Sequence, residues 1–324
     1  MGWQSHPFFF LAACVFAAGV HAQAAGPSAA EKVAWDSIVC VPGACNKLAG
    51  QGFLFATPGA KHAVLISHGS QGIDSRMYDY VDALQKAGFA ALVIDHWTPR
   101  GIGVTHEDYA AASLKGGNEF NMAADSLTAA AFLRARGYAR VGSVGESQGG
   151  GAAIMMQQKF AHAIIERNVR RLYASDFTLK PVDAVVGLYA PCFYRNAKRD
   201  AYVGTPLLLV TGEVDDETPS RYCEKHVGWM NARGGNVRIV VMPGEGHSFD
   251  APYARRYSNG PHYAKCDVLV DETGTTELNS GRKAAGEDAN AMMATCVSRG
   301  YHTGHSGRRF GAFPVWIGFF RDIL

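Results

Sequence analysis

The residues best suited to chemistry lie in one short stretch, Gly145-Glu146-Ser147-Gln148-Gly149. The pattern Gly-x-Ser-x-Gly fits a sharp turn from a strand into a helix, because glycines let the two backbones approach closely. Such a turn lifts the serine hydroxyl above the sheet, where it can attack a carbonyl carbon. The pattern therefore predicts that Ser147 is a nucleophile. The alternative is a glycine-rich turn that carries an incidental serine.

A serine hydroxyl is a weak nucleophile at neutral pH, so it needs a base, and the base needs an acid to orient it. Among the 12 histidines, only His68, His96 and His247 directly follow predicted strands. His247 comes after the last strand in a glycine-rich loop, and we expect it to be the base. The acid then belongs between the serine and the histidine in the chain. Asp215 and Asp216 both satisfy this requirement.

Two backbone N–H groups are expected to stabilise the negative charge that develops on the attacked carbonyl oxygen. One belongs to Gln148, directly after the serine, and the other to the loop His68-Gly69-Ser70, with Ser70 as the expected donor. We expect the His68 side chain to be a structural hydrogen-bonding group. Glu146 is expected to be a buried carboxylate bonded to backbone or to a polar neighbour, rather than an acid–base group.

Three further side chains, His96, Trp97 and Arg100, follow a predicted strand. As substrate-binding residues they would form a pocket wall that favours an acidic or aromatic acyl group. The alternative, which we favour, is a structural loop in which Arg100 pairs with an acid. No cofactor and no metal site are predicted, because no metal-ligand cluster or phosphate loop stands out.

The elements that must position these loops alternate between strands and helices. Short apolar runs predict buried strands, and apolar residues at helical spacing predict helices. A hairpin region is expected at 31–60, followed by strands at 63–67, 89–94, 140–145, 184–189, 206–211 and 237–242. Helices are expected at 78–87, 118–136, 152–171, 220–233, 284–297 and 314–324. This alternation predicts a parallel sheet with helices on both faces, and a site at the carboxyl ends of its strands.

The first 22 residues differ from the rest and predict a signal peptide. An apolar run at 8–18 has the length of a signal h-region and is too short for a membrane span. Small residues allow cleavage after Ala22 or near Ala24, although no Lys or Arg precedes the run. Leu11-Ala12-Ala13-Cys14 resembles a lipobox, so a lipoprotein anchored at Cys14 is the alternative. We expect an exported protein, periplasmic or secreted.

Six cysteines remain after Cys14, and an even number in an exported chain suggests three disulfides. Six cysteines allow 15 pairings, so the connectivity must come from position. A short turn separates Cys40 from Cys45, Cys192 and Cys223 follow neighbouring strands, and Cys266 and Cys296 remain. The expected pairs are Cys40–Cys45, Cys192–Cys223 and Cys266–Cys296. The alternative is buried free thiols.

Composition is that of a globular protein with a large core, at 48% hydrophobic and 19% charged residues. The formal net charge of +2 offers no basic face for nucleic acid. We expect a single domain at 23–324, with an irregular insertion at 251–283 after the histidine loop. A small-molecule substrate is expected, and the oligomeric state is not predicted.

Several of these motifs resemble the dienelactone hydrolase family of α/β-hydrolases over about residues 50–250. The motifs are 64–69, 95–101, 145–150, 189–192, 211–219 and 244–247. The resemblance implies an α/β-hydrolase fold with a mostly parallel sheet of about eight strands. It also implies a triad of Ser147, Asp215 and His247, which favours Asp215 over Asp216, and hydrolysis of ester or lactone bonds.

The sequence departs from that family at the nucleophile. Dienelactone hydrolases carry a cysteine there, whereas this chain has Ser147, which favours a general carboxylic-ester hydrolase. Two alternatives remain, a binding protein without turnover and an acyltransferase or peptidase on the same fold. The segment 251–312 has no counterpart in the resemblance.

Overall fold

The computed structural model describes most of the chain after the predicted signal peptide. The described residues are 29–41, 43–103, 109–198, 200–271, 274–285, 292 and 295–324. The predicted signal peptide, its cleavage sites and the lipobox at Cys14 lie outside them, as does most of the helix predicted at 284–297. Within the described ranges, every helix is too short or too polar to cross a bilayer.

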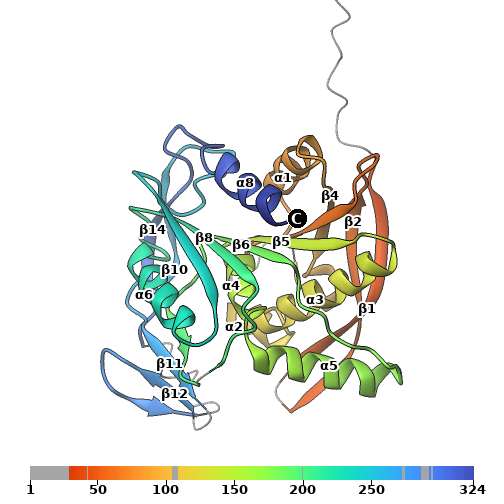
Figure 1. Cartoon of the computed structure of the whole chain (residues 1–324). Coiled ribbons are helices and arrows are strands. Elements are labelled where there is room, and N and C mark those ends of the chain that lie inside the picture. Colours follow the sequence, from red (N-terminus) through yellow and green to blue (C-terminus); the bar gives the residue numbers. More distant parts are fainter. Residues whose placement is uncertain are drawn as a thin grey trace, which may run out of the picture.

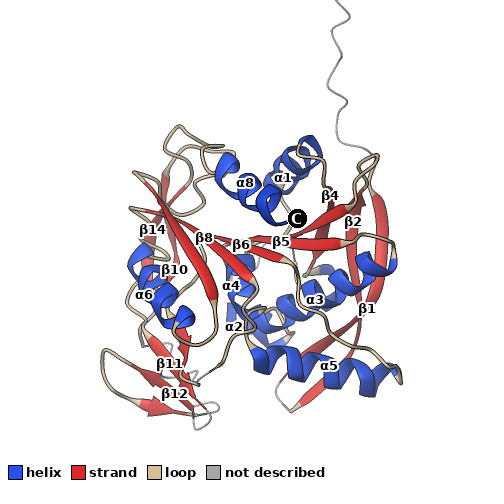
Figure 2. Ribbon diagram, in the orientation of Figure 1, coloured by secondary structure: helices blue, strands red, loops and turns tan. Residues whose placement is uncertain are grey.

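A central sheet of eight strands runs through the molecule (Figures 1 and 2). Its order is β1 (Glu31–Val41), β2 (Ala44–Phe55), β4 (Ala90–Asp95), β3 (His62–Ser67), β5 (Arg140–Glu146), β6 (Ala184–Leu188), β8 (Pro206–Gly212) and β9 (Asn236–Met242). The hairpin β1–β2 joins β4 in antiparallel pairing, and the remaining pairs from β4 to β9 are parallel. The mostly parallel sheet expected from the sequence is confirmed.

Helices cover both faces of this sheet (Figure 2). One face packs against α1 (Ser75–Lys86) and α8 (Phe313–Ile323), where Trp316 is fully buried. The other face packs against α3 (Glu119–Ala135), α4 (Gln148–Met155), α5 (Lys159–Tyr173) and α6 (Ser220–Asn231). Two short elements, η1 (Thr98–Arg100) and α2 (Tyr109–Leu114), lie between β4 and α3.

The single helix predicted at 152–171 is wrong, because α4 ends at Met155 and α5 begins at Lys159. The backbone between them bonds to a distant segment instead of continuing the helix. Lys159 N–H donates to the Ala201 carbonyl at 2.8 Å, and Gln157 carbonyl accepts from Val203 N–H at 2.8 Å. These hydrogen bonds to residues 201–203 replace the helical ones. The sequence pattern at 152–171 gives no sign of them, because their partners lie far away in the chain.

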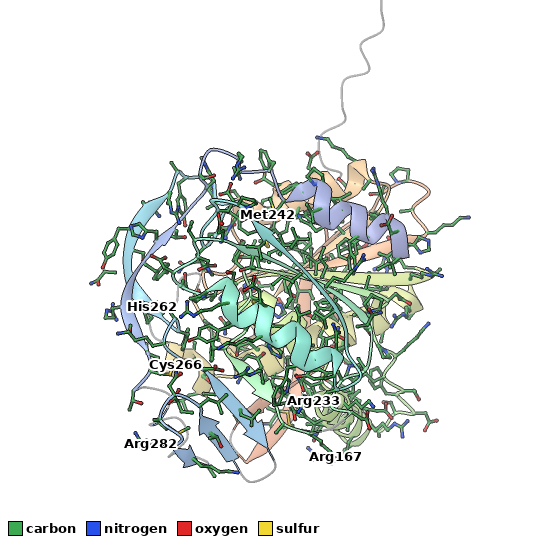
Figure 3. The ribbon with its side chains drawn as sticks, turned by 60° about the vertical axis from the view of Figure 1, so that its left-hand side comes forward. Arg167, Arg233, Met242, His262, Cys266 and Arg282 are labelled. Atoms are coloured by element: carbon green, nitrogen blue, oxygen red, sulfur yellow. A yellow bond between two sulfur atoms is a disulfide. The ribbon has the colours of Figure 1, made fainter. Side chains whose placement is uncertain are left out.

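The irregular insertion predicted at 251–283 is also wrong, because this part of the chain forms strands. β10 (Arg256–His262) pairs with β14 (Ser298–Thr303), and a second small sheet contains β13 (Lys283–Ala284), β12 (Gly274–Glu277), β11 (Val268–Asp271) and β7 (Tyr194–Asn196). Figure 3 shows His262, Cys266 and Arg282 along this extension, beside the central domain. β10 and β14 are largely solvent-exposed and polar, so they lack the apolar alternation that marks a strand.

Three disulfides join the six described cysteines in the pairs expected from their positions. They are Cys40–Cys45, Cys192–Cys223 and Cys266–Cys296. Cys40–Cys45 closes the β1–β2 hairpin, and Cys266–Cys296 closes the extension. Cys192–Cys223 ties the loop after β6 to α6, and both of its cysteines are buried. Three disulfides are consistent with an oxidising compartment.

We predict that the Cys192→Ser/Cys223→Ser double variant loses about 2–4 kcal/mol of unfolding free energy, because the disulfide restricts a long loop of the unfolded chain. Urea denaturation without reductant measures the loss. The matched control is Cys40→Ser/Cys45→Ser, which opens a much shorter loop and should cost less. Equal losses in the two variants would contradict the loop-length argument.

Candidate active site

Ser147 lies on a tight turn between β5 and α4, at the carboxyl edge of the sheet. Its backbone is held at φ 50° and ψ −114°, an arrangement that costs a non-glycine residue about 1–3 kcal/mol and recurs at functional sites. A side chain at Gly145 would place its Cβ only 2.1 Å from the Gly149 carbonyl oxygen. The glycines around the serine are therefore required by the close approach of strand and helix.

Three polar side chains form a connected chain at this turn. Ser147 Oγ lies 3.1 Å from His247 Nε2, and His247 Nδ1 lies 3.0 Å from Asp215 Oδ2. The His247 and Asp215 side chains are almost completely buried. The arrangement can move a proton from the serine hydroxyl to the imidazole while the carboxylate fixes the tautomer.

Asp215 is fixed in turn by its own loop. Its Oδ1 accepts the backbone N–H groups of Glu217 at 3.0 Å and Thr218 at 2.8 Å. The Thr218 hydroxyl lies 2.9 Å from Asp215 Oδ2 and 3.1 Å from His247 Nδ1. Asp216, the rival acid of the sequence analysis, is 45% exposed and binds the backbone N–H and the ring of His302. Of the two aspartates, only Asp215 reaches His247.

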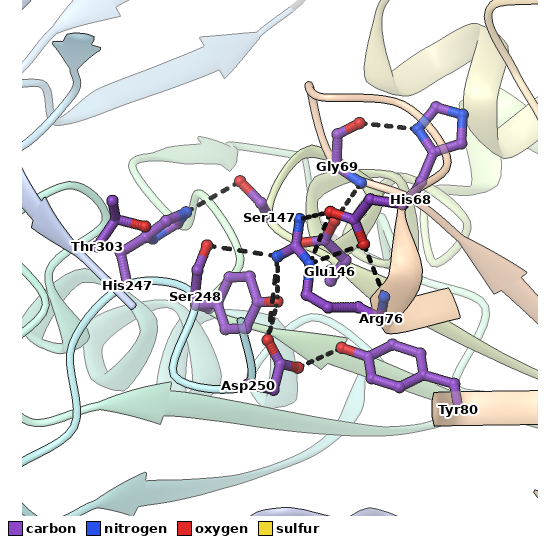
Figure 4. Close-up of polar contacts among 12 residues, drawn as sticks. His68, Gly69, Arg76, Tyr80, Glu146, Ser147, His247, Ser248, Asp250 and Thr303 are labelled. Atoms are coloured by element: carbon purple, nitrogen blue, oxygen red, sulfur yellow. Dashed lines mark hydrogen bonds and ion pairs between the residues drawn. The ribbon is translucent and has the colours of Figure 1, made fainter. Parts of the chain in front are cut away.

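The loop at 68–70 is held against the nucleophile strand by a buried carboxylate. Glu146 Oε1 accepts the Gly69 N–H at 2.7 Å, as Figure 4 shows, and Glu146 is 1% exposed. The His68 ring contacts the Gly69 carbonyl and accepts the His96 N–H, so it is structural, as expected. Gln148 is the first residue of α4, and its N–H therefore lacks an intrahelical acceptor. Ser70 and Gln148 stay our predicted oxyanion donors.

Arg76 is the partner of Glu146 that the sequence analysis missed. Its guanidinium lies 2.9 Å from Glu146 Oε2 (Figure 4). It also donates to the Tyr189 hydroxyl at 3.2 Å. Asp250 accepts from the hydroxyls of Tyr189 and Tyr80. Burial raises the pKa of Glu146, and the Arg76 cation opposes that shift. Arg76 starts a helix with mixed polarity, so no sequence pattern marks it as buried.

The substrate-binding role considered for His96, Trp97 and Arg100 is contradicted by their burial. The Arg100 side chain is 1% exposed and donates to Asp125 at 2.7 Å, and His96 Nδ1 lies 2.8 Å from the same carboxylate. Burial lowers the pKa of His96. Trp97 is 2% exposed, and its indole N–H donates to the Ser70 carbonyl. All three support the loops from behind, as in the structural alternative.

We predict that Arg100→Met lowers the unfolding free energy by about 3–5 kcal/mol, because it removes the guanidinium that compensates the charge of the buried Asp125 carboxylate. Chemical denaturation measures the loss. Arg136→Met is the matched control, because it removes an exposed ion pair with Glu31 that contributes about 1 kcal/mol or less. A stable Arg100→Met protein with a weakened substrate affinity would instead support the pocket-wall role.

A second carboxylate reaches His247 from the opposite side to Asp215. Glu217 Oε2 lies 3.2 Å from His247 Nε2, the same nitrogen that faces Ser147, and its side chain is 16% exposed. Tyr301 of β14 hydrogen-bonds to Glu217, and its ring lies 6.2 Å from the His247 ring. The sequence analysis missed both residues. Glu217 could have been noticed, because it lies in the predicted acid loop.

These two carboxylates determine the charge state of the imidazole. Burial of the ring lowers its pKa, but Glu217 and Asp215 outweigh that effect, so the pKa of His247 is raised to about 9. Burial raises the pKa of Glu217 to about 7, although the nearby His247 opposes the shift. The neighbouring carboxylates thus favour the protonated imidazolium of His247.

We predict that the His247 ring titrates near pH 9, and that Glu217→Gln moves the midpoint to lower pH because one stabilising carboxylate is gone. The measurement is an NMR titration of ring-labelled histidines, with the His247 signal assigned by its loss in His247→Ala. Glu213→Gln, an exposed carboxylate in the same loop, should leave the midpoint in place. A wild-type midpoint near 6.5, or no change in Glu217→Gln, would contradict the argument.

Comparison with known protein families shows to which family this chain belongs. Residues 77–264, more than half of the chain, match the prolyl oligopeptidase family, Peptidase_S9. The chain belongs to the prolyl oligopeptidase family. The match begins on α1 and ends in the extension after β10, so it includes the serine, aspartate and histidine described above.

Known proteins and solved structures also resemble this prolyl oligopeptidase family protein. Two uncharacterized proteins of Mycobacterium tuberculosis, strains CDC 1551 / Oshkosh and H37Rv, are each 29% identical over 62% of this chain and 68% of their own. A dienelactone hydrolase-like promiscuous phosphotriesterase from metagenomic libraries superimposes with a TM-score of 0.53 at 15% identity, over 91% of this chain and 99% of its own. The chain thus has the fold of dienelactone hydrolase-like α/β serine hydrolases, which confirms the fold expected from the sequence.

Proposed function

We propose that this serine hydrolase cleaves carboxylic ester or lactone bonds through an acyl-enzyme on Ser147. The observation that carries the proposal is the continuous contact from Ser147 Oγ through His247 to Asp215, at 3.1 and 3.0 Å. Both distances lie within hydrogen-bonding reach of a nucleophile, its base and the orienting acid. The strained backbone of Ser147 adds support, because such strain is kept where it serves function.

The proposed reaction begins when neutral His247 Nε2 takes the hydroxyl proton as Ser147 Oγ bonds to the carbonyl carbon. The negative charge on the carbonyl oxygen is stabilised by the N–H groups of Ser70 and Gln148. The imidazolium then gives its proton to the leaving alkoxide, the C–O bond breaks and the alcohol departs. Water repeats the sequence on the acyl-enzyme and releases the carboxylic acid and the free serine.

A peptidase is the second candidate, favoured by membership of the prolyl oligopeptidase family. The same three side chains can cleave an amide, with the leaving amine protonated in place of an alcohol.

We infer that the protein is exported, to the periplasm or outside the cell, because three disulfides persist best in an oxidising environment.

We predict that Ser147→Ala and His247→Ala each remove nearly all hydrolysis of a nitrophenyl ester, because triad members act as a unit. Asp215→Asn should lower kcat by about 10⁴, since the imidazole then adopts the wrong tautomer. Asp216→Asn is the matched control and should keep most of the activity. Steady-state kinetics of each variant on a nitrophenyl ester measure the contributions of these residues. Comparison of the wild-type rates on that ester, a lactone and an aminoacyl anilide shows which class of bond the protein cleaves.

Labelling provides an independent readout. A serine-directed phosphonate should modify one residue, in the peptide that contains 145–151, and Ser147→Ala should abolish the label. Cleavage of the anilide in preference to the esters would favour the peptidase. Full esterase activity in Ser147→Ala would refute the proposed nucleophile.

A further inference from the structure

Apart from Asp215, which also faces His247, Glu217 differs from the carboxylates near the site that pair with an arginine. Glu146 pairs with Arg76, Asp125 with Arg100, and Asp267 with Arg195. Glu217 pairs with no lysine or arginine among the described residues, and its cationic partner is the ring of His247 itself. Its Oε2 is buried and accepts no hydrogen bond within the described part of the chain.

This pairing is unfavourable for a base. Glu217 Oε2 and Ser147 Oγ lie 3.2 and 3.1 Å from the same nitrogen, His247 Nε2, which carries one hydrogen at most. An imidazolium held by the carboxylate cannot accept the serine proton. A second cation beside Glu217 would compete for the carboxylate and leave Nε2 to the serine. Within the described residues, Glu217 is thus an acidic position next to Ser147 and His247 that no lysine or arginine neutralises.

An aromatic side chain contacts this carboxylate, and a second pair of rings belongs to the same part of the molecule. Tyr301 hydrogen-bonds to Glu217, and Phe193 stacks on Tyr263 with ring centroids 4.8 Å apart. Burial raises the pKa of Tyr263 to about 12, and the charges of Glu119 and Glu217 add to the shift. Carboxylates combined with aromatic faces suit an alkylated ammonium group, which gains from charge and from cation–π contact.

We propose, on the basis of the proposed ester hydrolysis, that Glu217 is a specificity-determining residue that binds a cationic group on the leaving alcohol. His247 Nε2 must reach the leaving oxygen to protonate it. Glu217 Oε2 lies 3.2 Å from that nitrogen. A substrate group bound to Glu217 therefore belongs to the leaving alcohol, within a few bonds of its oxygen. The preferred substrate class is an ester of a short amino alcohol, and an anionic alcohol is repelled.

The test compares two acetate esters of the same shape, the 2-(trimethylammonio)ethyl ester and the 3,3-dimethylbutyl ester, which differ by nitrogen for carbon. Wild-type protein should have a kcat/KM at least about tenfold higher for the cationic ester, a difference of about 1.4 kcal/mol. Glu217→Gln keeps the side-chain shape and should bring the ratio to about one. A general loss of stability would lower both rates and leave their ratio unchanged.

The matched control is Glu224→Gln, an exposed carboxylate on α6, which should keep the wild-type ratio. The free alcohols give a readout that does not need turnover: the trimethylammonium alcohol should protect wild type, but not Glu217→Gln, from phosphonate labelling better than 3,3-dimethylbutanol does. Equal rates and equal protection in wild type would overturn the role of Glu217 while leaving the serine hydrolase intact. Absence of both labelling and ester hydrolysis would overturn the proposed function as well.

Discussion

The site depends on one buried guanidinium. Arg76 lies in the first turn of α1 and donates to Glu146 at 2.9 Å, to Tyr189 at 3.2 Å and to Ser248 at 3.5 Å. Glu146 directly precedes Ser147, and Ser248 directly follows His247. A single cation therefore links the nucleophile strand to the histidine loop. A buried charge that loses its partner costs several kcal/mol of stability. Moving either loop away from Arg76 would therefore destabilise the protein.

Charge is balanced differently on the two sides of Ser147. Behind it, Arg76 and Arg100 each have carboxylate partners, and these pairs fix loops without taking part in proton transfer. In front of it, His247 is contacted by Asp215 on one nitrogen and by Glu217 on the other. The arginine–carboxylate pairs hold the loops around Ser147 rigidly. Glu217, whose partner is the His247 ring, can instead bind a cationic group of a substrate, as proposed above.

Sequence patterns predict the central domain because its chemistry is local. Buried parallel strands are continuous apolar runs, and the Ser147 turn requires glycines, so both leave a direct signal. The choice of Asp215 over Asp216 came only from resemblance, since adjacent aspartates look alike until one is seen to reach His247. The exposed strands of the extension leave no apolar alternation. Arg76 and Glu217 were missed because a charged residue gains its partner, and its burial, from elements far away in the chain.

The extension does more than cover one side of the domain, because it is bonded to the loop that carries His247. His247 pairs with Thr303 of β14, and its carbonyl accepts the Gly304 N–H at 2.9 Å. Two residues before Thr303, on the same strand, Tyr301 holds Glu217. One strand thus fixes both the backbone of the base and the carboxylate that faces its Nε2. Changes in the extension should consequently alter the strength of the base and the charge preference of the site together, because the two share a support.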